Sequence, residues 1–121
     1  MKVLIVDDEP LVRRSLEKVF TKAGHEVATA SDGNEGVSSW KEFQPDGVVL
    51  DVLMPGLTGP EVIAEVKPEF KTAIVLISAY SGDYDPDSVK QLGADIFIEK
   101  PFESITGIVS ELENIWSIKN K

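Results

Sequence analysis

The side chains with the clearest chemical potential in this sequence are acids that directly follow runs of apolar residues. Asp7 and Asp8 follow "VLIV" (3–6), and Asp51 follows "VVL" (48–50). A bare carboxylate is rarely placed against a buried strand, because taking its charge out of water costs several kcal/mol in practice. The acids therefore indicate a site with a chemical task.

The three acids converge on one pocket if the two strands are neighbours, because the working crevice of an open parallel sheet lies at the carboxyl ends of its strands. Two carboxylates ~4 Å apart repel by roughly 4 kcal/mol at an effective dielectric near 20. Either some of them are protonated or a cation lies among them. Hard oxygen ligands with room for water suit Mg²⁺ or Mn²⁺ better than zinc. His25 is expected at the opposite end of the sheet.

Two further polar residues follow other strands at the same edge. Ser78 comes directly after "IVLI" (74–77), and Lys100 comes after "IFI" (96–98) and one acid. A carboxylate beside such a metal can attack a phosphoryl group and become an aspartyl phosphate. The hydroxyl and the ammonium would then bind the transferred oxygens. Each residue alone has a simpler explanation, as a loop acid, a helix cap or a solvent-facing lysine, but together they indicate phosphoryl transfer.

The elements that must position these residues alternate along the chain. Five short apolar or β-branched runs are expected to be strands: 3–6, 26–30, 48–50, 74–77 and 96–98. The run "EVATA" (26–30) is the most polar and suits an edge. The other runs hardly alternate, as is typical of parallel strands that are covered on both faces. With amphipathic segments between the runs, the sequence predicts one α/β domain, a doubly wound five-stranded parallel sheet with five helices.

Breaker residues limit the expected helices. Gly24 ends the first helix, Pro45 follows the second, Pro60 and Pro68 bracket the third, Asp85 caps the fourth before Gly93, and an apolar stripe from Ile105 to Trp116 marks the fifth. The last five residues, "SIKNK", are expected to fray.

Composition excludes several classes of function. The chain has 121 residues, no cysteine and a formal net charge of −9. The absence of cysteine rules out disulfides and thiol chemistry, and fits a cytoplasmic protein. The acidic balance argues against direct nucleic-acid binding by this domain. No segment approaches the ~18 apolar residues of a membrane span, and the start is not a signal peptide.

Four motifs, "LIVDDEP", "VVLDVLMPGLTG", "IVLISAY" and "GADIFIEKPF", carry a family resemblance over essentially all 121 residues. The chain resembles the receiver domain of two-component response regulators. That resemblance implies a flavodoxin-like sheet of order 2-1-3-4-5. It also implies a receiver domain over residues 1–121 with no effector domain in this chain, and Met1 directly before the first strand favours a natural beginning.

The resemblance assigns roles to the acids. Asp51 would be the phospho-acceptor and Asp8 a direct Mg²⁺ ligand. Asp7 would help to hold the metal, through water, and Leu53 would contribute only its backbone carbonyl. Beyond assisting its own phosphorylation and dephosphorylation, such a domain is not an enzyme.

The remaining roles concern the switch and its partners. Ser78 would move toward the phosphoryl group that Lys100 neutralises, while Phe97 turns inward behind it. The Lys100–Pro101 peptide would be cis. The phosphate would come from a sensor histidine kinase or phosphotransfer protein. A downstream target or effector domain would read the surface of the fourth helix, fifth strand and fifth helix.

Two bulky residues are expected beside the path of hydrolytic water, Leu53 and Tyr80, which lie two positions past Asp51 and Ser78. They predict slow loss of the phosphate.

Two other functions fit part of the pattern. A Mg²⁺-dependent phosphohydrolase with an aspartyl-phosphate intermediate would carry its nucleophile on the first strand, with a general acid two residues later and usually a cap insertion. A carrier of flavin mononucleotide would need a phosphate loop after the first strand, where Asp7, Asp8 and Glu9 would repel the phosphate. Both fit the sequence less well than a signalling switch does.

Overall fold

The computed structural model describes residues 1–79 and 85–121. Its strands form one parallel sheet in the order β2-β1-β3-β4-β5. The strands are β1 (Lys2–Val6), β2 (Glu26–Ala30), β3 (Gly47–Asp51), β4 (Ala73–Ser78) and β5 (Ile96–Glu99). All five expected strands are confirmed, and so is the sheet order that the resemblance implies.

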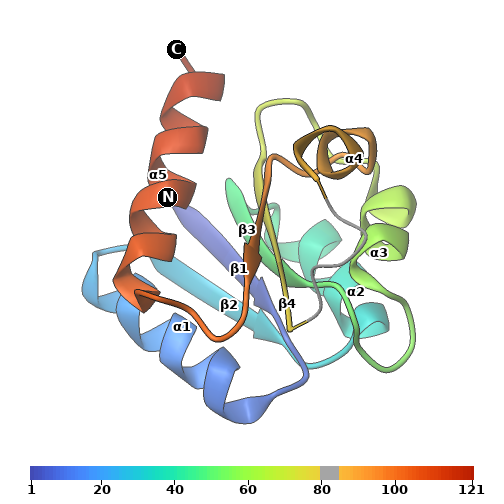
Figure 1. The fold of residues 1–121 in the computed structure, drawn as a ribbon, viewed down its shortest axis with the longest axis horizontal. Helices are drawn as coiled ribbons and strands as arrows, with labels where there is room; N and C mark the ends of the chain where they lie inside the picture. Colours follow the sequence, from blue (N-terminus) through green and yellow to red (C-terminus); the bar gives the residue numbers. More distant parts are fainter. Residues whose placement is uncertain (80–84) are drawn as a thin grey trace.

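The helices cover both faces of this sheet. They are α1 (Pro10–Lys22), α2 (Gly33–Phe43), α3 (Gly59–Val66), α4 (Pro86–Gln91) and α5 (Ile105–Lys119). Figure 1 shows α1 and α5 on one face and α2, α3 and α4 on the other. Each face has its own hydrophobic cluster, one including Phe20 and Leu112, the other including Trp40 and Val62.

The near-absence of alternation in the central strands follows from this double cover. Successive residues of β3 point to opposite faces, so Val48 and Leu50 join one cluster while Val49 joins the other. All five residues of β3 and all six of β4 are buried. A polar side chain at the end of either strand is therefore held by a rigid core.

Local sequence explains most helix boundaries. Asp85 caps α4 by accepting a hydrogen bond from the Ser88 backbone N–H at 2.8 Å. Gly24, just past α1, has φ +95°, a conformation that favours glycine. α3 ends at Val66, and Lys67 rather than Pro68 terminates it, in a left-handed conformation with φ 52°.

The expectation that residues 117–121 fray is wrong. α5 continues through Lys119. The Lys119 ammonium lies 2.8 Å from Asp95 Oδ1 and donates to the Thr72 carbonyl at 2.9 Å. The Asn120 side-chain amide donates to the Lys71 carbonyl at 3.0 Å. These partners are far away in sequence, so the local polarity of the tail gave no sign of them.

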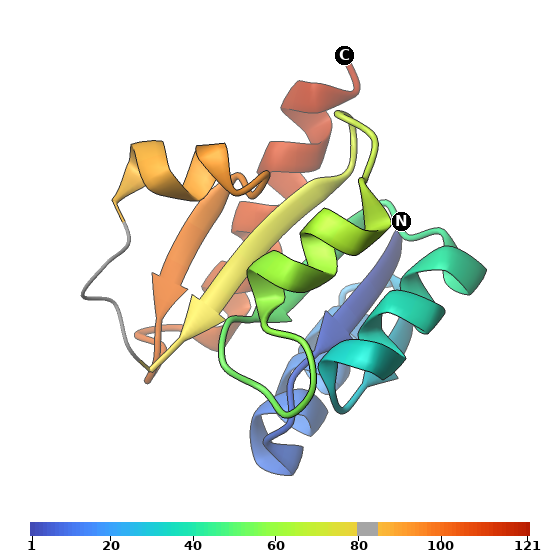
Figure 2. The ribbon, with the colours of Figure 1, turned by 90° about the vertical axis from the view of Figure 1, so that its right-hand side faces the viewer.

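All four strand pairs are parallel, so the carboxyl ends of the strands meet at one edge of the sheet, and Figure 2 shows the arrowheads of β1, β4 and β5 pointing the same way. The carboxyl-end residues of β1, β3 and β4 are buried. None of the helices in the described part of the chain has the length and hydrophobicity of a membrane span.

Candidate functional site

Neighbouring strands deliver the first two acids to the carboxyl edge. β1 and β3 pair in parallel with Val6 opposite Leu50, so the next residues, Asp7 and Asp51, are also neighbours. The Asp7 backbone N–H still donates to Ala30 of β2, at 3.1 Å. Asp7 is fully buried and Asp51 is 3 % exposed. The fold thus holds two carboxyl groups out of water, side by side.

Asp8 completes a cluster of three carboxyl groups. One oxygen from each of Asp7, Asp8 and Asp51 lies within 4.8 Å of the other two. The set offers only hard oxygen donors, and Asp8 is half-buried, which leaves one side open to water. This donor set fits Mg²⁺ or Mn²⁺, which accept carboxylates and retain several waters.

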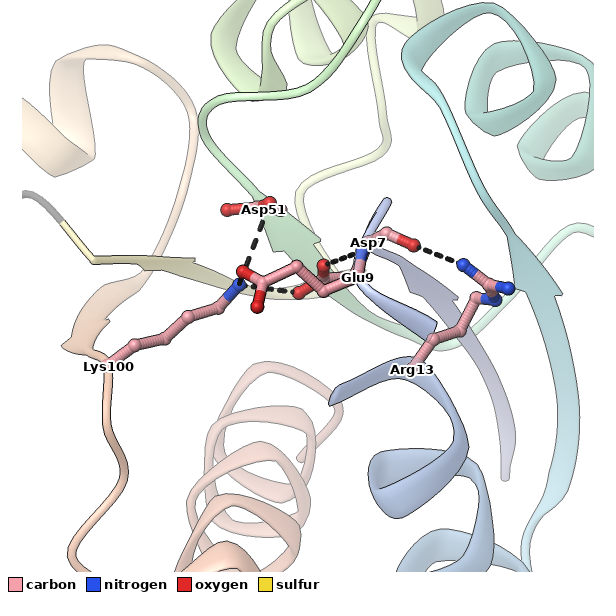
Figure 3. A network of polar contacts seen from close by, with 5 residues as sticks. All are labelled: Asp7, Glu9, Arg13, Asp51 and Lys100. Carbon is pink, nitrogen blue, oxygen red and sulfur yellow. Dashed lines mark hydrogen bonds and ion pairs between the residues drawn. The ribbon is translucent and has the colours of Figure 1, made fainter. Parts of the chain in front are cut away.

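Lys100 brings a positive charge into the same cluster. Its ammonium lies 2.8 Å from Asp7 Oδ2, 2.9 Å from Glu9 Oε1 and 3.7 Å from Asp51 Oδ2 (Figure 3). The residue directly follows β5, its backbone N–H donates to the Ser78 carbonyl at 2.8 Å, and its peptide bond to Pro101 is cis. The acids are thus partly neutralised by the protein itself.

Burial dominates the titration of the site. Desolvation, followed by the negative charge of Asp7, raises the pKa of Asp51 from its ordinary 3.8 to about 7, against the opposing effect of Lys100. Desolvation also raises the pKa of Asp7, although Lys100 and the Glu9 backbone N–H oppose it. For Lys100, burial favours loss of the proton, but hydrogen bonds to Asp7 and Glu9 outweigh it, so its pKa is raised.

One atom of the cluster has less than its full set of partners. Asp7 Oδ2 is buried, and the Lys100 ammonium, 2.8 Å away, is its one close cationic partner among the described residues. A carboxylate oxygen can accept more than one interaction. Asp7 Oδ2 therefore has capacity for a further cation or for a water bound to one.

The other residues predicted for the site differ in their burial and in their distance along the chain from Asp51. Ser78 ends β4 and is 2 % exposed; it lies one residue beyond Ile77, the partner of Asp51 in the register. The Leu53 side chain is 60 % exposed, two residues past Asp51. Phe97 is half-buried on β5 and packs against the cluster under α2, α3 and α4. Tyr80 lies outside the described residues.

Two contributors were absent from the residues predicted for the site. Glu9 shares the Lys100 ammonium and donates its backbone N–H to Asp7 Oδ1 at 2.8 Å, while Arg13 donates to the Asp7 carbonyl at 2.9 Å (Figure 3). The available signal was the third acid of "DDE" directly before a first-turn proline. That position puts Glu9 next to the acidic edge of the sheet. Nothing in the local sequence indicates that its partner is Lys100, 91 residues away.

The loop that leaves Asp51 rests on α2 and α3. The Gly33 N–H donates to the Pro55 carbonyl at 3.3 Å, and the Gly59 N–H donates to the Val52 carbonyl at 2.9 Å. Both glycines are buried, and a Cβ on Gly33 would meet the backbone of Leu57. The close approach of these backbones fixes the path of residues 52–58, including the Leu53 carbonyl.

Comparison with known protein families agrees with this geometry. The family model described as "Response regulator receiver domain" matches residues 3–112. A relative described as "Probable transcriptional regulator ycf27", from Porphyridium aerugineum, is 41% identical over 101 residues, which cover 84% of this chain and 42% of the relative. Its counterpart from Guillardia theta is 40% identical, with 84% and 40% covered. The chain thus spans less than half the length of these curated relatives.

Solved structures agree on the fold. The receiver domain protein from Methanospirillum hungatei has a TM-score of 0.89 at 20% identity, with 98% of this chain and 95% of that chain covered, which supports the fold alone. TrrA from Thermotoga maritima, solved in complex with Mg²⁺-BeF, has a TM-score of 0.80 at 30% identity, with 94% and 97% covered.

Proposed function

Since this chain belongs to the family of response regulator receiver domains, we propose that Asp51 is its phospho-acceptor and that Asp7, Asp8 and Asp51, with the Leu53 carbonyl, hold Mg²⁺. Receiver domains are signalling domains of two-component systems, and a phosphorylation switch fits the site. The observation that carries the assignment is the cluster of three carboxyl oxygens within 4.8 Å, with Lys100 beside it. The Mg²⁺-BeF complex of TrrA supports the same chemistry.

The transfer is a displacement at phosphorus. A carboxylate oxygen of Asp51 forms a bond to the phosphorus atom of a phosphohistidine on a kinase or phosphotransfer protein. The P–N bond breaks, and the histidine nitrogen keeps the electron pair and takes up a proton. Asp51 must be deprotonated to attack, and its pKa near 7 makes that form accessible at neutral pH. Bound Mg²⁺ would supply positive charge for the phosphoryl oxygens, and Mn²⁺ could do the same.

The residues around Asp51 bind the oxygens of the transferred phosphoryl group. The Lys100 ammonium, already 3.7 Å from Asp51 Oδ2, neutralises a phosphoryl oxygen after moving away from Glu9. Ser78, at the end of the neighbouring strand, donates its hydroxyl to another. Phe97, on β5 beside β4, then turns toward the space behind Ser78, which changes the surface of α4, β5 and α5.

Response regulators act between histidine kinases and downstream effectors. For this chain we propose a sensor histidine kinase or phosphotransfer protein as the donor, and a downstream protein or effector domain as the reader, in the cytoplasm. Residues 1–121 would form a receiver unit, without nucleic-acid binding of their own. The phosphohydrolase alternative is not favoured, because the acceptor lies on β3 rather than β1.

The direct test is mass spectrometry of the intact protein after incubation with a small-molecule phosphodonor and Mg²⁺. Wild type should gain the mass of one phosphoryl group, because a single acceptor, Asp51, is proposed. Asp51→Asn should gain none, and chelation of Mg²⁺ should abolish the gain in wild type. An exposed acid on α4 offers a matched control, and Asp87→Asn should behave as wild type. Labelling that survives in Asp51→Asn would refute the assignment.

We also expect slow hydrolysis of the phosphorylated form, because the bulky side chain of Leu53 flanks the approach to Asp51. Leu53→Asn replaces it with an amide that can hold a water molecule. The change should accelerate loss of the phosphoryl group at least about threefold, equivalent to ~0.6 kcal/mol in the barrier. The decay is followed by intact mass after the donor is removed. Ile118→Asn, an equally exposed position at 59 %, should leave the rate unchanged, and an unchanged rate in Leu53→Asn would contradict the role.

A further inference from the structure

An apolar groove lies at the end of the sheet where the strands begin, away from the acids. It is a hollow of about 700 Å³ between the α3–β4 loop, the segment from the end of α4 to the start of β5, and the carboxyl end of α5. Phe70 and Ile118 line it and are 80 % and 59 % exposed. They are two of the four exposed large apolar side chains among the described residues. Such clustering is typical of an interaction surface rather than of scattered surface residues.

The groove is pre-formed, because hydrogen bonds and an ion pair connect the segments that form its walls. Lys119 of α5 contacts both Thr72 and Asp95, and Asp95 Oδ2 also accepts the Ile74 N–H at 2.7 Å. The Lys119 ammonium lies 5.0 Å from the centroid of the Phe70 ring, which orients the ring beside the groove. Ala94, in its lining, is only 4 % exposed. A pre-formed site of this kind loses little conformational freedom on binding.

The charge of the groove differs from that of the chain as a whole. Lys67 and Lys90 line it, and neither has an ion pair or a side-chain hydrogen bond with any described residue. Lys119 is balanced by Asp95, which leaves Glu69 as the single remaining acid of the lining. The groove is thus locally positive on a chain of net charge −9. Carboxylates beside an apolar side chain would complement it.

We propose that this groove docks a peptide segment of a partner protein in which a bulky apolar residue is flanked by carboxylates. The apolar residue packs between Phe70 and Ile118, and its acidic neighbours pair with Lys67 and Lys90. A second copy of this chain is a poorer occupant, since two molecules of charge −9 repel each other at long range.

Lys90, Ile96 and Ile118 of the groove belong to α4, β5 and α5, but they lie at the end of that surface that is far from the acids, so binding is expected in both phosphorylation states. The groove borders the first residues of β4 and β5, whereas Ser78 and Lys100 lie at or just past their last residues. Six residues at about 3.3 Å each place the groove roughly 20 Å from the acids. The docked peptide would therefore hold a partner near the domain independently of the switch.

The test uses the whole chain and a library of short synthetic peptides, each with one central Phe, Leu, Ile, Met or Trp between Asp and Glu residues. We expect binders in the micromolar range by fluorescence anisotropy, weakening as salt is raised. Chemical shifts in ¹⁵N-labelled protein should change around Phe70, Lys90 and Ile118. A matched library with Lys in place of the acids should yield no binders.

Variants test the contacts individually. Phe70→Ser and Lys90→Glu should each weaken the best peptide at least about tenfold, while Leu11→Ser and Lys18→Glu, exposed on α1, should not. Thermal unfolding verifies that each variant folds. The proposal is overturned by an absence of binders, by equal binding of the basic library, or by binding only after phosphorylation. Dimerisation that Phe70→Ser abolishes would assign the groove to a second copy instead. Phosphorylation of Asp51 is measured separately, so either proposal can fail alone.

Discussion

Replacement of Asp51 by asparagine should stabilise the metal-free protein by roughly 2–4 kcal/mol at about pH 8, and by much less near pH 4.5. The pKa of Asp51 is raised by burial and by Asp7 to about 7, so the folded protein binds this proton more tightly than the unfolded chain does. The stability from this carboxyl group is fully present below the unfolded pKa of about 3.8 and is lost as the pH rises through about 7. Asparagine carries no charge, so its contribution to stability does not fall as the pH rises.

Urea unfolding in the presence of a chelator, at both pH values, measures the difference. Asp87→Asn, on the exposed surface of α4, should show no comparable dependence on pH. Adding Mg²⁺ at pH 8 should then stabilise wild type by mass action and Asp51→Asn much less, because the asparagine removes a ligand. An equal difference between wild type and Asp51→Asn at both pH values would show that Asp51 is not a buried, strained carboxylate.

Gly33→Ala should destabilise the protein by about 3 kcal/mol, a large effect for the addition of one methyl group. A Cβ at this position would lie 2.7 Å from the Leu57 amide nitrogen, closer than real contacts allow, and the neighbour is backbone that cannot rotate away. Either α2 or the loop of residues 52–58 must move. Because that loop carries the Leu53 carbonyl away from Asp51, affinity for Mg²⁺ should fall as well.

Gly107→Ala provides the matched control. A Cβ there would lie 3.4 Å from Ser104 Cβ, an ordinary contact, within the first turn of α5. Alanine in a helix should add up to about 1 kcal/mol of stability. Urea unfolding and calorimetric titration with Mg²⁺ distinguish the two variants. If Gly33→Ala were as stable as wild type, the contact between α2 and the loop would be softer than the structure indicates.

The strands and the acidic edge could be predicted from sequence because their causes are local. Doubly covered strands require short apolar runs, and in a parallel sheet an acid directly after such a run must lie at the carboxyl edge. To predict that Asp7 and Asp51 lie side by side, one therefore needed to assume only that β1 and β3 are neighbours. The sheet order and the individual roles came from the family resemblance, since spacing alone leaves several topologies open.

The failures involve contacts that span the chain. Lys119 binds Asp95 and so extends α5 through a segment that is polar and unremarkable by itself. Glu9 and Asp7 share the ammonium of Lys100, which is 91 residues away from Glu9 in the sequence. In both cases a long side chain reaches a partner that only the assembled sheet brings near, and no periodic pattern records such pairs.

Lys100 also determines how the acidic pocket returns to its ion-free state after an ion has left. An ion that binds Asp7 and Asp51 competes for them with a cation that remains covalently attached to the chain. When that ion departs, the ammonium returns from a few ångströms away, at an effective concentration that dilution cannot change. Resetting is therefore a unimolecular event, with a rate independent of the protein concentration.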